Sequence, residues 1–241
     1  MSNLLFALLA TFLISLISLL GVFSLSIKHK LLHKIIIYLL ALAAGTLMAD
    51  AFFHLIPESA EALGIETSLL VTFLAFFAFF IIEKIFQWRH CHKENCHVHS
   101  FGYMNLLGDS IHNFIDGLII AASFAIDWRV GLSSSLAIAL HELPQEFGDF
   151  GVLIHAGFSK KKAILLNFAV ALVAILGTIV GSFYSSVESF NYYLLSVAAG
   201  GFIYIATSDL LPEIRAEKNV GKLLLSLLSF SIGAGLIYFL A

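Results

Sequence analysis

Two polar clusters interrupt long apolar stretches near the middle of the chain, at residues 109–117 and 141–149. Residues 103–128 contain no Lys or Arg, and residues 130–159 contain none either. A charged side chain at the centre of a membrane helix costs roughly 2.5–3.5 kcal/mol on insertion scales, so such residues normally face a polar interior and mark a function. Acidic groups at this depth without a basic partner nearby in sequence indicate a cation site. The candidate metal ligands are His112, Asn113, Asp116, His141, Glu142, Gln145 and Glu146, with Asp109 and Asp149 as candidates for the ion path.

The spacing within each cluster places donor groups together, because residues i and i+4 of a helix share a face. His112 and Asp116 then point the same way, and so do His141 and Gln145. We expect a tight turn near residues 127–129 to make the two helices antiparallel neighbours. Their polar clusters would lie at similar depth and could enclose one ion or two adjacent ions.

The donor set consists of imidazole, carboxylate and amide groups, without a thiolate inside the membrane. Such a set suits zinc first, then divalent iron, manganese or cadmium, and argues against monovalent copper. We interpret this metal as a substrate, and nothing in the sequence indicates an organic cofactor.

The composition places the chain in a lipid bilayer. Of 241 residues, 60% are hydrophobic and only 12% are charged, which is too apolar for a soluble domain. The net charge of −3 gives no indication of nucleic acid as a partner. We predict an all-α integral membrane protein with one transmembrane domain over residues 1–241. Eight segments are long enough to cross a bilayer, at residues 3–26, 33–56, 67–87, 103–126, 130–156, 162–184, 190–211 and 221–240.

The basic residues define the orientation of these segments. Of the 13 Lys and Arg, 12 lie on one side of the predicted membrane and only Arg129 lies on the other. By the positive-inside rule, the odd-numbered loops are cytoplasmic and both termini are outside. The short loops favour a prokaryotic plasma (inner) membrane.

An internal repeat relates the second and seventh segments. Each contains Ala-Ala-Gly, and Pro-Glu begins twelve residues after the Gly. The Gly and Pro are Gly45 and Pro57 in the first copy and Gly200 and Pro212 in the second. The two copies run in opposite directions, and inverted repeats around a binding site at mid-membrane are a recurrent transporter design. The polar residues of the repeats could lie on the ion path or form hydrogen bonds between helices. They are Asp50, His54, Asp209 and Glu213.

A His- and Cys-rich loop at about residues 88–101 is cytoplasmic in this topology, so a disulfide is not expected there. Two interpretations stay open: a site that receives metal after release, or a flexible loop with weak metal affinity. The residues concerned are His90, Cys91, His92, Cys96, His97 and His99.

The two clusters resemble the motifs of the ZIP (Zrt-, Irt-like protein) family of divalent metal transporters. Residues 112–117 read H-N-F-I-D-G, which fits the H-N-F-x-D-G motif of one branch. Residues 141–146 read H-E-L-P-Q-E, which fits that branch's H-E-x-P-H-E except at Gln145. The sequences G-D-F at residues 148–150 and H-L-I-P-E at residues 54–58 are also similar to that family.

The resemblance implies two inverted three-helix repeats around the fourth and fifth helices, with alternating access carrying metal into the cytoplasm. Gln145 occupies a ligand position where an amide oxygen is a weaker ligand than imidazole, which leaves the metal preference open. Residues 163–183 contain no acid, although some relatives supply a Glu there to a second metal position. The family's ligands carry over onto His112, Asn113, Asp116, His141 and Glu142.

Two other functions compete with metal import. An intramembrane metalloprotease would need a second His four residues after the first, and that position is Gln145. A membrane metal sensor would bind without transport. Whether the protein forms a homodimer is left open by the sequence.

Overall fold

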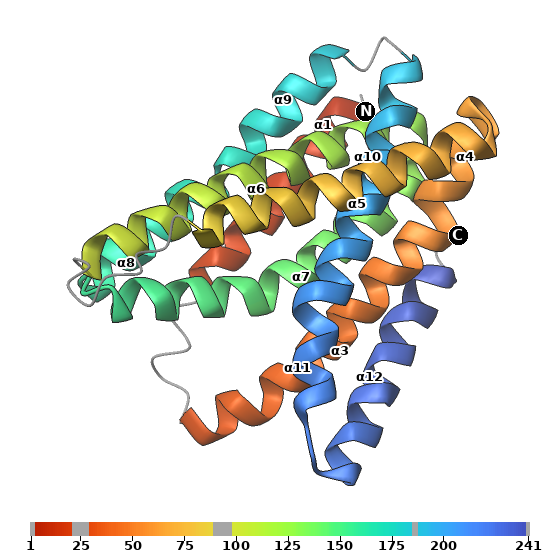
Figure 1. The fold of residues 1–241 in the computed structure, drawn as a ribbon. Coiled ribbons are helices and arrows are strands. Elements are labelled where there is room, and N and C mark those ends of the chain that lie inside the picture. Colours follow the sequence, from red (N-terminus) through yellow and green to blue (C-terminus); the bar gives the residue numbers. More distant parts are fainter. Residues whose placement is uncertain (1–2, 21–28, 89–97, 185–187, 240–241) are drawn as a thin grey trace.

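The computed structural model describes residues 3–20, 29–88, 98–184 and 188–239, and all elements in these ranges are helical (Figure 1). In chain order they are α1 (Asn3–Ser15), η1 (Leu16–Leu20), α3 (His29–Asp50), η2 (Ala51–Leu55), α4 (Ile56–Leu63), α5 (Ile65–Trp88), α6 (Val98–Ile126), α7 (Trp128–His155), α8 (Lys160–Ala171), α9 (Val173–Tyr184), α10 (Glu188–Ile205), η3 (Ala206–Leu210), α11 (Leu211–Ala216) and α12 (Val220–Tyr238).

Six stretches of the described residues are long and apolar enough to cross a membrane, as the prediction of an integral membrane protein requires. Of the eight predicted spans, the first is apolar but shorter, at Asn3–Leu19. The second predicted span that is not among the six is α7, which has 28 residues but carries a polar cluster at its middle. The six long apolar stretches are Ile37–Leu63, Ile65–Lys84, Asn105–Ile126, Lys160–Tyr184, Ser189–Ala216 and Val220–Tyr238.

The second and seventh predicted helices extend beyond their predicted ends. We expected the second to stop at residue 56, yet helix continues through Pro57 to Leu63. Proline lacks an N–H and disturbs the preceding turn of a regular helix. In both helices a five-residue π segment (η2 or η3) ends two residues before the proline, which then lies in the first turn of the next helix. The wider turn accommodates the proline, so the chain continues as a helix.

The two copies of the repeat also make equivalent close contacts. Gly45 of α3 lies against α12, where an added Cβ would be 2.1 Å from the carbonyl oxygen of Phe230. Gly200 of α10 lies against α5, where an added Cβ would be 2.3 Å from the carbonyl oxygen of Thr72. The second helix thus contacts the eighth as the seventh contacts the third, the pattern that an inverted repeat produces.

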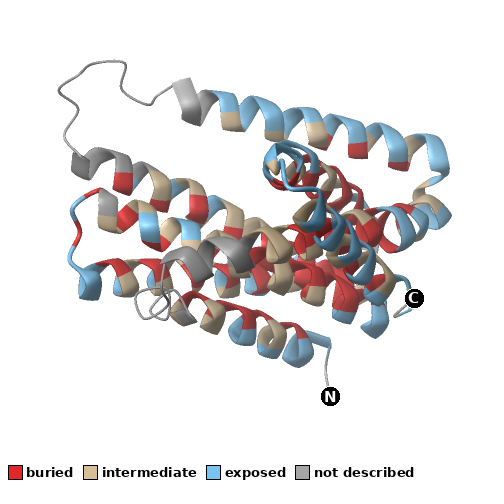
Figure 2. Ribbon diagram, turned by 90° about the horizontal axis from the view of Figure 1, so that it is seen from below, coloured by how far each residue is buried: buried red, intermediate tan, exposed pale blue. Residues whose placement is uncertain are grey.

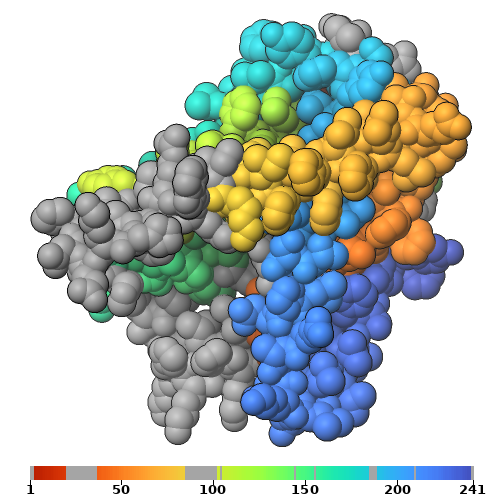
Figure 3. All heavy atoms as spheres, in the orientation of Figure 1, coloured from red at the N-terminus to blue at the C-terminus, as the bar shows by residue number. Residues whose placement is uncertain are grey.

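The hairpin formed by α6 and α7 lies at the centre of the bundle. It contacts α1, α3, α9 and α10, so most of its polar residues are enclosed. Figure 2 shows buried residues gathered along the middle of the bundle and exposed residues on the outer helices. In the space-filling view α5 lies on the outside, in orange and yellow (Figure 3). Its exposed side chains include Leu70 and Phe73, which suits a surface in contact with lipid.

The close contact at Gly200 predicts that this position accepts no side chain larger than that of glycine. Gly200→Ala should lower the free energy of unfolding by about 1–3 kcal/mol, because the added Cβ would collide with backbone of α5. Gly235→Ala is the matched control, since nothing lies within 4 Å of its added Cβ. Thermal unfolding of the detergent-solubilised protein measures both variants. Equal melting temperatures for the two would contradict the close packing of α5 and α10.

Candidate metal centre

A single residue connects α6 to α7 and makes them antiparallel neighbours. Asp127 has extended backbone, and its side chain caps α7 by accepting a hydrogen bond of 2.7 Å from the N–H of Arg129. Aspartate is favoured at this position because its oxygen satisfies an N–H that lacks a partner within the helix. The predicted tight turn is therefore confirmed, and it brings the two polar clusters to the same depth.

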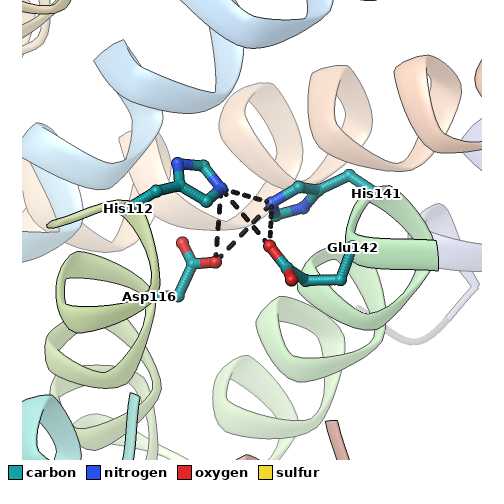
Figure 4. A group of neighbouring side chains, drawn as sticks. All are labelled: His112, Asp116, His141 and Glu142. Carbon is teal, nitrogen blue, oxygen red and sulfur yellow. Dashed lines mark hydrogen bonds and ion pairs between the residues drawn. The ribbon is translucent and has the colours of Figure 1, made fainter. Parts of the chain in front are cut away.

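Four side chains from the two helices converge on one point (Figure 4). Donor atoms of His112, Asp116, His141 and Glu142 all lie within 4.8 Å of one another. The two Nε2 atoms are 3.1 Å apart. Each Nε2 atom lies 3.4–3.6 Å from one oxygen of each carboxylate. Three of the four residues are buried, and His112 is partly buried.

These separations fit a tetrahedral zinc ion. Zinc binds imidazole nitrogen and carboxylate oxygen at about 2.0–2.2 Å, so neighbouring donors of a tetrahedron lie about 3.3–3.6 Å apart. The nitrogen–oxygen distances of 3.4–3.6 Å match this spacing, and the nitrogen–nitrogen distance of 3.1 Å is slightly shorter. The four residues can therefore hold one metal ion with little rearrangement.

The two Nε2 atoms share a hydrogen bond whose proton a metal would displace, and the other hydrogen bonds around the cluster lead away from its donor atoms. Nδ1 of His141 lies 3.2 Å from the carbonyl oxygen of Ala137, so it carries the proton and donates it there. Nε2 of His141 then presents a lone pair to the cluster, the arrangement usual for a metal-binding histidine. Asp116 Oδ2 and Glu142 Oε1 are buried without a hydrogen-bond donor. Such oxygens are costly in a protein interior unless a cation approaches them.

Asp109 fixes the orientation of two predicted ligands beside the cluster. Its Oδ1 accepts hydrogen bonds from the amide nitrogens of Asn113 and Gln145, at 2.9 and 3.1 Å. An ionised carboxylate oxygen only accepts hydrogen bonds, so both amides turn their NH₂ groups toward Asp109. Their carbonyl oxygens are thereby left for other partners. Asn113 and Gln145 are thus held next to the four-donor cluster through Asp109.

Glu146 is buried and accepts a hydrogen bond from the amide of Asn167 in α8. Sequence analysis did not identify Asn167 as a site residue, because the search of the sixth predicted helix considered only acids. The signal was present, since Asn167 is the only amide in the apolar residues 163–183. Asn167 Oδ1 is buried without a partner.

The ion-path residues predicted in the two repeats lie on different elements. His54 Nδ1 is 2.7 Å from Asp50 Oδ1, and Ser134 of α7 donates a hydrogen bond of 2.9 Å to Asp50 Oδ2. This pair connects the end of α3 with the central hairpin, away from the four-donor cluster. Glu213 is exposed on α11, and the backbone of Asp209 lies in η3.

Most of the predicted His- and Cys-rich loop lies outside the described residues. The backbone of His99 lies in the first turn of α6. The remaining residues of the loop's motif lie outside the described residues: His90, Cys91, His92, Cys96 and His97.

Comparison with known proteins identifies the class to which this fold and site belong. A family model described as ZIP zinc transporter matches residues 2–102 and 89–241. The chain therefore belongs to the ZIP family, which confirms the resemblance of its motifs. Because this is a family of transporters, its members are not enzymes, and the metalloprotease alternative is set aside.

Individual relatives agree with this assignment. Zinc transporter ZIP4 of Homo sapiens is 31% identical over 91% of this chain and 45% of its own length. Zinc transporter ZIP13 of Pongo abelii is 36% identical over 81% of this chain and 63% of its own length. Zinc transporter zipt-7.1 of Caenorhabditis briggsae is 29% identical over 83% of this chain and 69% of its own length. The chain thus spans less than half the length of the human relative.

The geometry of the cluster predicts a large effect of one carboxylate on metal binding. Asp116→Asn should weaken zinc binding by about 10–100-fold, because it replaces a charged donor that lies among two imidazoles and a second carboxylate. Asp127→Asn is the matched control, since asparagine caps a helix as well as aspartate does. Isothermal titration calorimetry in detergent measures both variants. Equal affinities would show that the four-donor cluster is not the zinc site.

Proposed function

We propose that this protein imports a divalent transition metal, most readily zinc, into the cytoplasm through the cluster of His112, Asp116, His141 and Glu142. The observation that carries the proposal is the set of four donors, three of them on buried residues, whose nitrogen–oxygen distances match a tetrahedral zinc site. The relatives' names, which describe zinc transporters, support the choice of metal. Zinc would be the substrate of this transport, which needs no organic cofactor.

We also propose the number of membrane helices, their orientation and their arrangement in repeats. α1 and α7 join the six apolar spans as membrane helices, giving eight with both termini outside the cytoplasm. The equivalent π segments and the paired glycine contacts support two inverted repeats around α6 and α7. Alternating access would then arise from movement of the repeats relative to the central hairpin, with the metal held between them. The short connections favour a plasma (inner) membrane.

The predicted ligands outside the cluster take supporting parts in this proposal. Asn113 and Gln145 can turn carbonyl oxygens to the metal as it enters or leaves, because Asp109 holds their NH₂ groups. Glu146, hydrogen-bonded to Asn167, would offer an oxygen to a second ion. Such oxygen ligands bind zinc more weakly than imidazole does, which suits an ion that must be released.

A metal sensor is the remaining alternative, and transport itself separates the two functions. Purified protein in proteoliposomes should take up zinc down its gradient, whereas a sensor would bind zinc without flux. His112→Ala should reduce the flux about tenfold or more, since it removes one of four donors. Glu61→Gln, an exposed acid on α4, is the control and should transport normally. Zinc flux that His112→Ala leaves unchanged would refute transport through this cluster.

Gln145 provides a test of metal preference. Gln145→His restores the imidazole found in the motif of the family branch and should raise zinc affinity about tenfold, equivalent to about 1.4 kcal/mol. Because zinc favours imidazole more than manganese does, affinity for manganese should change less. Competition between the two metals in a calorimetric titration measures the change. An unaltered preference would mean that residue 145 does not reach the metal.

A further inference from the structure

Close glycine contacts join the helices of this protein in pairs. Gly45 and Gly233 pack α3 and α12 together. Gly200 packs α10 against α5, and Gly177 packs α9 against α6. At each of these positions an added Cβ would lie 2.0–2.3 Å from a backbone oxygen of the neighbouring helix. Backbones that interlock this closely resist sliding, so movement between helices falls on the contacts that side chains make.

Helices α3 and α7 pack together and share a buried polar contact. Ser134 of α7 donates a hydrogen bond of 2.9 Å to Asp50 Oδ2, while Nδ1 of His54 lies 2.7 Å from Asp50 Oδ1. Asp50 and Ser134 are fully buried, and His54 is 6% exposed. The neighbouring Ser133 and Ser135 instead donate to carbonyl groups of α7 itself. Ser134 is thus the serine of this run that ties α7 to another helix.

This contact lies in the half of the hairpin between the metal cluster and the turn at Asp127. Ser134 precedes His141 by seven residues, which is about two helical turns, or roughly 10 Å along α7. Ile120 and Ile138 are buried in the same half, within the main hydrophobic core. In the proposed topology the turn at Asp127 is outside. Apolar side chains and the Ser134–Asp50 hydrogen bond therefore fill the hairpin on the outer side of the cluster.

The second copy of the internal repeat has no equivalent acid. Asp50 follows Gly45 by five residues, and the residue five positions after Gly200 is Ile205. Ile205 is partly buried and packs against the hydrophobic core. Two inverted repeats that made equal contacts could exchange their roles and give two conformations of similar free energy. A hydrogen bond to a buried carboxylate in one copy alone therefore favours one conformation over the other.

We propose that Ser134, Asp50 and His54 form a latch that holds α3 against α7 and favours the conformation described here. The inference rests on the proposed function, because alternating access requires the repeats to move relative to the hairpin. Separating the two helices would leave a buried carboxylate oxygen without its donor. A hydrogen bond to a charged group is strong enough to shift an equilibrium about tenfold or more. His54 lies against the other oxygen of the same carboxylate, so Asp50 stays directed toward α7.

Distances between two spin labels, measured on the full-length protein in nanodiscs, test the latch. Lys161→Cys carries one label at the start of α8, which packs on the hairpin, and Val220→Cys carries the other at the start of α12, which packs on α3. Cys91 and Cys96 are changed to serine in this background. With the latch intact, one distance should dominate. Ser134→Ala should raise the ratio of a second distance to the first about tenfold.

Two further variants and a flux measurement complete the test. Ser133→Ala is the matched control, because its hydroxyl bonds within α7, and it should keep the original distances. Ser134→Thr retains a hydroxyl and should keep them as well. A hydrogen bond with a structural role alone would lower the melting temperature of Ser134→Ala without a second distance, and that result would overturn the latch. Absence of zinc flux in the unaltered protein would refute the proposed function instead, while the spin-label distances would still decide whether Ser134 and Asp50 hold this conformation.

Discussion

The structure depends on carboxylates that are buried in a membrane protein and that have no Lys or Arg of the described residues paired with them. Asp116 and Glu142 each turn an oxygen without a hydrogen-bond donor toward two imidazoles. Removing an unpaired charge from water costs several kcal/mol, and the attraction of a divalent cation is the direct compensation. The central position of α6 and α7 follows from this constraint, because the surrounding helices must separate these groups from lipid.

The surrounding helices combine close packing with local irregularity. Gly45 and Gly200 allow backbone contact between α3 and α12 and between α10 and α5. Each repeat then widens into a π segment before its proline, and such segments are frequent at functional sites. The Ser134–Asp50 hydrogen bond joins one of these regions to the central hairpin. Any movement of this repeat relative to the hairpin must either keep Ser134 and Asp50 together or break their hydrogen bond.

The helical segments and the antiparallel hairpin could be predicted from the sequence, and so could the approach of His112, Asp116, His141 and Glu142. The sequence did not separate these four residues from Asn113, Gln145 and Glu146, which it also predicted as ligands. Residues i and i+4 share a helix face, and the polar and charged residues between two long apolar segments predict the turn at Asp127 that folds α7 back against α6. Asn167 could not be assigned to Glu146 in the same way, because their contact depends on how α8 packs against the hairpin. The continuation of the helices through Pro57 and Pro212 was also not predicted. A proline lacks the N–H that a regular helix needs, and the wider turn of the preceding π segment accommodates it.

The central claim is that zinc binds between two imidazoles and two carboxylates. X-ray absorption spectroscopy of the protein loaded with one equivalent of zinc tests it most directly. We predict four nitrogen or oxygen ligands at about 2.0–2.2 Å, two of them imidazoles, and a single imidazole in His112→Ala. A zinc–sulfur distance of about 2.3 Å would place the metal on the Cys91 and Cys96 loop and contradict the account.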